Sequence, residues 1–151
     1  MNLQDWLRSG DLLRRPSNRG EITRLLEVAR RDLADAAASG LSLDRQFAIA
    51  YEAAYSLAIV VLRAEGYRTR SGAAGHHWLA FAVLPEIVGE MAVARARYYQ
   101  SCRRKRHQAT YEQIGVATEA EVRELVADVE AFREEVLAWL HQRHPESAPG
   151  K

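Results

Sequence analysis

The sequence predicts an all-α fold, an up-and-down bundle of four to five helices in a single domain. Apolar residues recur at three- and four-residue spacings through most of the chain, and no segment shows the alternation and turn chemistry of a strand hairpin. The length of 151 residues and the hydrophobic fraction of 48% suit one domain with one core. We expect the bundle over residues 20–143, after an N-terminal segment, 1–19, with a short helix, and before a flexible tail, 144–151.

The first two helices of the bundle differ in their apolar faces. Residues 20–39 carry apolar side chains on one face and charged ones on the other, which predicts an amphipathic helix. A stop signal at Ser39 and Gly40 and a capping residue at Ser42 separate it from the next helix. Residues 43–65 are apolar on nearly every face, and Glu52 interrupts the run. We therefore expect this helix in the middle of the bundle and not in a membrane.

Three further helices are expected in the second half of the chain. The polar, glycine-rich stretch 67–75 predicts a loop, and residues 76–84 predict a short helix that ends at Pro85. The next helix begins near Ile87 and leads into a strongly basic segment. A capping box that starts at Thr118 begins a long last helix, which has the clearest helical periodicity in the chain.

The overall composition excludes several classes of protein. The 21 basic and 20 acidic residues nearly cancel, so net charge alone does not predict a nucleic-acid binder. Cys102 is the single cysteine, which excludes an intramolecular disulfide and a multi-cysteine zinc site. Residues 1–15 mix charged with apolar side chains and lack the apolar core of a signal peptide. We expect a cytoplasmic protein that does not bind a membrane.

Positive charge is concentrated late in the chain. Between Glu90 and Glu112 there is no acidic residue. Arg103 and Arg106 lie one helical turn apart, so the pair can hold a phosphate through forked hydrogen bonds. The interval holds six cations followed by a histidine and includes tyrosines that could stack on bases: Arg95, Arg97, Arg103, Arg104, Lys105, Arg106, His107, Tyr98, Tyr99 and Tyr111. Alternatively, the cations complement the C-terminus of their helix and the acidic face of the last helix, and bind no ligand.

Four short segments occur in a fixed order along the chain. They are Ala-Tyr-Glu-Ala-Ala-Tyr at 50–55, Glu-Gly-Tyr-Arg at 65–68, Gly-His-His at 75–77, and Arg-Arg-Lys-Arg-His-Gln-Ala-Thr-Tyr at 103–111. Together they resemble HEPN domains, over about residues 21–140. The resemblance implies a helical bundle, commonly a homodimer, that acts as a metal-independent endoribonuclease or as the partner of a small nucleotidyltransferase. It also implies a role in a toxin–antitoxin or defence-type system.

The resemblance implies a catalytic motif as well. Active HEPN proteins carry an arginine, roughly four to six residues and then a histidine, so that a guanidinium stabilises the phosphate while an imidazole moves a proton. Here the motif is degenerate, because five positions after Arg106 stands Tyr111, and His107 lies only four positions after Arg103. We expect Arg106, His107 and Tyr111 to be catalytic. Phosphate binding then falls to Arg97, Arg103, Arg104 and Lys105.

His76 and His77 are auxiliary candidates. Adjacent histidines on a helix point about 100° apart and rarely share a metal ion, so we expect no metal and no cofactor. One of them is expected to cap its helix and pack beside Trp78. Alternatively, one of them approaches Arg103 and Arg106 in the fold and replaces the missing histidine of the motif.

Other functions stay open at this point. The same basic surface could dock a protein partner in a non-catalytic, dimeric interaction module. A small-ligand pocket could be lined by Tyr51, Tyr55, Trp78 and Phe81, although aromatics at helical spacing are more often core. Cys102 could be a reactive thiol, but its place on the apolar side of its helix favours a buried one. Neither a glycine-rich phosphate loop nor an HExxH motif is present in the sequence.

Overall fold

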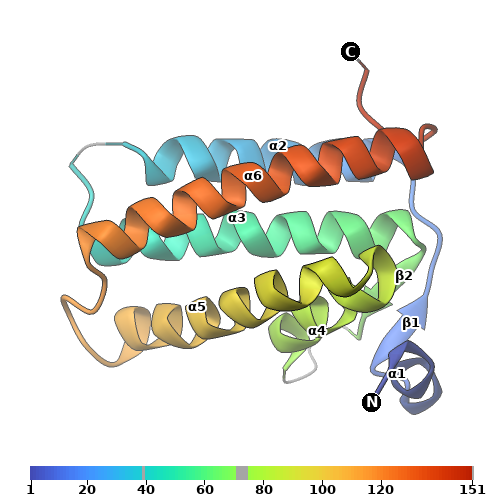
Figure 1. Cartoon of the computed structure of the whole chain (residues 1–151), viewed down its shortest axis with the longest axis horizontal. Coiled ribbons are helices and arrows are strands. Elements are labelled where there is room, and N and C mark those ends of the chain that lie inside the picture. The colour runs from blue at the N-terminus through green and yellow to red at the C-terminus, as the bar shows by residue number, and fades with distance from the viewer. Residues whose placement is uncertain (39, 71–74, 151) are drawn as a thin grey trace.

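The chain folds into an all-α bundle, as the periodicity predicts. The computed structural model describes residues 1–38, 40–70 and 75–150. In chain order the elements are α1 (Leu3–Ser9), β1 (Leu12–Arg14), α2 (Arg19–Ala36), α3 (Leu43–Ala64), β2 (Tyr67–Thr69), α4 (His76–Val88), the 3₁₀ turn η1 (Glu90–Ala92), α5 (Val93–Tyr111) and α6 (Glu119–Arg143). Figure 1 shows α3 in the middle, with α2 and α6 on one side and α5 and α4 on the other.

The central position of α3 confirms the prediction from its apolar faces. Its side chains are buried on all sides, among them Phe47, Tyr51, Leu57 and Leu62. Four neighbouring helices, α2, α4, α5 and α6, pack against it. Small residues such as Ala54, which is fully buried, let those helices approach closely.

By length and composition α3 is also apolar enough to cross a membrane. However, 67% of its most apolar 18-residue window is buried within the bundle. That burial is typical of the core helix of a soluble protein.

The ends of α2 and α6 follow the capping rules. The side chain of Asn18 accepts a hydrogen bond from the backbone of Glu21 at the start of α2. Thr118 and Glu121 form the predicted reciprocal capping box at the start of α6. Since both caps satisfy backbone N–H groups that lack a helical partner, α2 and α6 begin at defined residues.

The boundaries between α4 and α5 differ from the prediction. Pro85 does not end α4, which continues to Val88. The helix accommodates the proline in its last turn, although the missing N–H leaves the Phe81 carbonyl without its usual helical partner. Gly89, with φ of 103°, stops the helix in a conformation that favours glycine. The turn η1 follows, so α5 begins at Val93 and not near Ile87.

A small sheet was not predicted. β1 and β2 pair antiparallel, with Leu12 opposite Thr69 and Arg14 opposite Tyr67. The expectation that the chain has no strands was wrong here, because three-residue strands are too short to show alternation and no hairpin turn joins them. Of the loop predicted over 67–75, residues 71–74 lie outside the described residues, as does Ser39 of the stop signal.

The last described residues pack against the bundle, where we expected a flexible tail. Ala148 is buried at 3% exposure, and the backbone N–H of Ser147 donates to the carbonyl of His144. The His144 ring lies with Nε2 2.8 Å from Oε1 of Glu65 at the end of α3. A turn after α6 thus folds residues 144–148 back onto the core, and Lys151 lies outside the described residues.

Candidate functional site

The first turn of α4 brings His77 against α3. Nδ1 of His77 lies 2.9 Å from the hydroxyl oxygen of Tyr51. The ring of His77 also stacks on Tyr55, with centroids 3.8 Å apart and planes 4° apart. Since Tyr51 and Tyr55 are four residues apart on one helix, they share a face and hold the imidazole together.

Two arginines of α5 face the same place. The guanidinium carbon of Arg106 lies 5.8 Å from the ring centroid of Tyr51, and its Nη2 donates to Glu52 Oε1 at 3.1 Å. Nε of Arg106 is buried and has no hydrogen-bond partner among the described residues. The side chain of Arg103 is held by Gln100, to which its Nε donates at 3.1 Å.

We name this group the His77 cluster: Tyr51, Tyr55, His77, Arg103 and Arg106. It joins the two arginines predicted to bind phosphate to one of the two auxiliary histidines. The sequence alternative in which a histidine from elsewhere approaches Arg103 and Arg106 is supported by the Tyr51 ring, which contacts both Arg106 and His77, and by the charge effect of both arginines on His77.

The electrostatics of the cluster keep the imidazole neutral. Burial, the neighbouring His76 and the charges of Arg106 and Arg103 together lower the pKa of His77 to about 4. Burial raises the pKa of the Tyr51 hydroxyl far above its ordinary value, although both arginines oppose that shift. At neutral pH the pair is thus an uncharged imidazole beside a protonated phenol.

The hydrogen bond between the pair involves one ring nitrogen of His77. When Nδ1–H donates to the Tyr51 oxygen, Nε2 keeps its lone pair, which can accept a proton. Within the described chain no hydrogen bond occupies Nε2 of His77. The chemistry available here is proton transfer next to two guanidinium groups.

Of the three residues predicted to be catalytic, Arg106 belongs to the His77 cluster, whereas the other two lie elsewhere on α5. His107 and Tyr111 are exposed, with ring centroids 5.0 Å apart, and His107 Nε2 is 3.7 Å from Glu112. Neither forms a hydrogen bond or ring contact with His77 in the described ranges. The structure thus separates His107 and Tyr111 from the place where an arginine and a histidine meet.

The basic residues of α5 do not form one unneutralised ridge. Lys105 pairs with Glu121 of α6, and Arg95 pairs with Asp128 and Glu135 of the same helix. By contrast, Arg97 and Arg104 are exposed, and no described carboxylate pairs with them or with Arg103. The free positive charge of α5 is therefore confined to three arginines, with Arg106 shared between Glu52 and the cluster.

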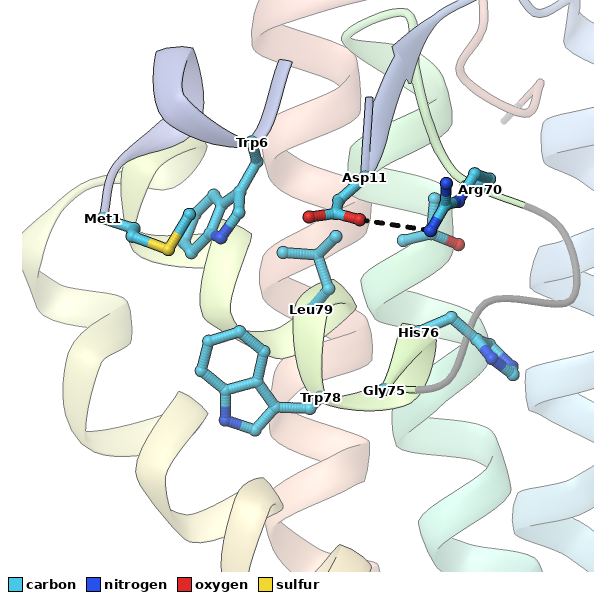
Figure 2. A pocket seen from close by; sticks show the side chains of 9 residues that line it. Met1, Trp6, Asp11, Arg70, Gly75, His76, Trp78 and Leu79 are labelled. Atoms are coloured by element: carbon cyan, nitrogen blue, oxygen red, sulfur yellow. Dashed lines mark ion pairs between the residues drawn. The ribbon is translucent and has the colours of Figure 1, made fainter. Parts of the chain in front are cut away.

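His76 lies between the His77 cluster and a neighbouring cleft, with its ring centroid 6.3 Å from that of Tyr55. Its ring centroid lies 4.7 Å from that of His77, and it borders the cleft between α1 and α4. Figure 2 shows this cleft, with the His76 ring turned away from Trp6 and Trp78. The two indoles meet edge to face, with centroids 6.2 Å apart, which fixes α1 on α4. We assign this cleft to packing.

No metal site emerges from the described residues. They hold no group of three or more His, Cys, Asp or Glu side chains arranged to bind an ion. The buried Cys102 lies at 3% exposure and has no thiol neighbour, because it is the single cysteine.

Comparison with known proteins assigns no family to this chain. No family model matches it, and neither a curated protein nor a solved structure does. The HEPN resemblance stays a hypothesis based on four short segments, so the function has to be argued from the side chains.

Three members of the site were not predicted as such. Tyr51 and Tyr55 were considered only as walls of a pocket shared with Trp78 and Phe81, and Glu52 only as an interruption of the apolar run. In the structure Tyr51 and Phe81 are fully buried, whereas Trp78 is 44% exposed and borders the α1 cleft. The sequence feature that could have identified these residues is the pair of tyrosines one turn apart on the central helix.

Proposed function

We propose that this protein binds RNA at the His77 cluster and cleaves it without a metal ion. One observation carries the proposal: a neutral imidazole is hydrogen-bonded to a buried tyrosine and lies within the field of two arginines. Guanidinium groups bind phosphate oxygens, and the negative charge of a bound phosphate offsets theirs, which raises the pKa of His77 back towards the range of a general base at neutral pH. The HEPN resemblance, which implies an arginine–histidine ribonuclease, supports the same chemistry with a histidine from a different helix.

The proposed step is a transesterification within the RNA chain. His77 Nε2 takes the proton of a ribose 2′-hydroxyl while that oxygen attacks the adjacent phosphorus. The bond from phosphorus to the 5′ oxygen breaks, and water supplies the proton that this oxygen gains. The products are a 2′,3′-cyclic phosphate and a 5′-hydroxyl end. Arg103 and Arg106 stabilise the negative charge on the phosphate oxygens during the attack.

Tyr51 acts in this proposal as a positioning residue. In the reacting tautomer Nδ1–H of His77 donates to the Tyr51 oxygen, which leaves Nε2 as the base. Tyr51→Phe is therefore expected to lower the cleavage rate without weakening RNA binding, because the arginines that hold the phosphate stay in place. A general base typically contributes about 10²–10⁴-fold, so the loss for Tyr51→Phe should be smaller than for His77→Gln.

Labelled single-stranded RNA incubated with the protein in chelator tests the proposal. We expect wild type to cleave and His77→Gln to lose at least about 100-fold in rate. The matched control is His141→Gln, which changes an exposed histidine of α6. Full cleavage by folded His77→Gln would contradict the proposal. Loss in His107→Gln alone would instead place the activity at the degenerate motif.

RNA binding is measured separately by fluorescence anisotropy. Arg103→Ala with Arg106→Ala should weaken binding and reduce its salt dependence, since each phosphate contact releases counterions. Arg123→Ala, at an exposed position of α6 with 73% side-chain exposure, is the control and should bind like wild type. Equal binding by all three proteins would exclude the cluster as the phosphate site.

A second candidate is a non-catalytic interaction module that forms dimers. One specific observation favours it: Met91 is 97% exposed beside an apolar groove lined by Val88, Phe132 and Trp139. A methionine at such a groove suits a protein interface. Light scattering on wild type and Met91→Asp tests this candidate, which predicts a dimer that the aspartate converts to a monomer. A monomeric wild type at high concentration would exclude self-association.

A further inference from the structure

A second cavity adjoins the His77 cluster. It has a volume of about 170 Å³ and lies where α2 and α3 meet β2. Its polar walls come from six residues: Tyr55, Ser56, Arg63, Tyr67, Arg68 and Thr69. Tyr55 is common to both places, because it lines the cavity and stacks on His77. A ligand in the cavity is therefore one aromatic ring away from the proposed base.

The walls of the cavity offer the chemistry that recognises a nucleobase. Tyr55 and Tyr67 supply aromatic rings, and bases in single strands bind proteins by stacking on such rings. The hydroxyls of Ser56 and Thr69 can hydrogen-bond to base edges. Aliphatic side chains of α2 and α3 form the rest of the wall, as they do in most small-ligand sites.

The surroundings of the cavity carry surplus positive charge. Arg63 and Arg68 both donate to one carboxylate oxygen of Glu21, so two cations share one anion. Nε of Arg68 is buried and has no hydrogen-bond partner among the described residues. Arg14 lies over the ring of Tyr67, 5.5 Å from its centroid, and is exposed. These groups could hold a phosphate that flanks a bound base.

We propose that this cavity is a nucleobase subsite for the nucleotide next to the one that reacts at His77. The inference rests on the proposed function, because it uses the same RNA strand. With a phosphate on Arg103 and Arg106, the strand passes Tyr55 and places the neighbouring base between Tyr55 and Tyr67. The following phosphate then meets Arg14 and Arg68. The two-stranded sheet, which contributes Arg14 and Tyr67, is thereby part of the binding surface.

Adenosine 5′-monophosphate is the probe, titrated into ¹⁵N-labelled full-length protein. We expect the amide signals of Ser56 and Thr69 to move with saturation. Tyr67→Leu removes one stacking face and should weaken binding about tenfold. Ile114→Ala is the control, since Ile114 is fully exposed in the connection after α5 and lies far along the chain from the cavity. If Tyr67→Leu fails to fold, Ser56→Phe fills the cavity without removing its walls and should block the probe.

The outcomes distinguish the two proposals. Unmoved Ser56 and Thr69 signals, or Tyr67→Leu and Ser56→Phe proteins that bind like wild type, overturn the subsite even if RNA cleavage depends on His77. Binding in the cavity, together with RNA cleavage that His77→Gln leaves intact, supports the nucleotide site and overturns the proposed function. Where both proposals hold, wild type should cut RNA with an abasic nucleotide beside the cleaved bond about tenfold less efficiently than intact RNA. Tyr67→Leu should cut the abasic and the intact RNA equally.

Discussion

Tyr51 and His77 lie on different helices, and their side chains meet at 2.9 Å in the half-buried interface between α3 and α4. The pairing places an ionisable ring where protonation is unfavourable, because burial and two nearby arginines oppose a positive charge. The burial and the positive charges around the imidazole therefore make the stability of the fold depend on pH.

The first prediction concerns that pH dependence. The pKa of His77 is about 4 in the folded protein, below the ordinary value of 6.5. Between these values the unfolded chain binds more protons, so the free energy of unfolding is complete above pH 6.5 and falls as the pH drops towards 4. Because the half-buried ring is partly screened by water, we expect a loss of about 1–2 kcal/mol. Urea unfolding at pH 7 and pH 4.5 measures this loss of free energy. In His77→Gln the loss between the two pH values should be smaller by about the same amount.

The second prediction concerns Glu21, whose side chain is 15% exposed and bridges two helices and the sheet. Glu21→Gln leaves Arg63 and Arg68 close together without their shared anion, so we expect a loss of about 1–3 kcal/mol in the free energy of unfolding. Glu27→Gln on the same helix is the control. Its carboxylate pairs with Arg30 at 59% exposure and should contribute less than about 1 kcal/mol. Equal losses in the two variants would show that the Glu21 bridge stabilises the fold no more than an exposed ion pair does.

The helices could be predicted from sequence where local rules decide the structure. The capping box at Thr118 and the apolar face behind it define α6 without reference to any other element. The all-apolar character of α3 likewise predicts its central position, because only a surrounded helix can bury every face. Pro85 misled the prediction, since α4 continues past the proline for three residues although one helical hydrogen bond is lost.

The candidate site could be predicted only in part. Arg103 and Arg106 are three residues apart on one helix, so they lie on the same face, and this follows from the sequence alone. Which histidine they meet depends on how α4 packs on α3, and no periodicity encodes that packing. The contact between His77 and Tyr51 and the pairing of β1 with β2 both join distant segments, which is why the structure was needed to find them.

The third prediction concerns the thiol of Cys102. Burial raises its pKa to about 12, although hydrogen bonds from Tyr98 and Ser101 oppose the shift. The sequence left open whether neighbouring cations activate this thiol, and the burial argues that they do not. We expect an aromatic disulfide reagent at pH 8 to modify the native protein at least about 100-fold more slowly than the urea-unfolded protein. Similar rates in the two states would mean that α5 opens readily or that the thiol is accessible.

The last prediction concerns Asp44, which ties the connection between α5 and α6 to the start of α3. Its carboxylate accepts hydrogen bonds from the backbone N–H of Gly115 at 2.7 Å and of Ala117 at 2.9 Å. These hydrogen bonds lower the pKa of Asp44, and the one from Ala117 has the largest effect. The contribution of Asp44 to stability is therefore present above pH 3.8 and is lost as the pH falls below that value.

Asp44→Ala removes both acceptors while leaving the helix intact, and we expect a loss of about 1–2 kcal/mol in the free energy of unfolding at pH 7. Amide hydrogen exchange should accelerate at Gly115 and Ala117 but not in the core of α3, because only the connection is released. Asp35→Ala, at an exposed position of α2, is the control and should leave both readouts unchanged. If exchange at Gly115 and Ala117 stays slow in Asp44→Ala, the capping box that follows at Thr118 holds the connection without help from α3.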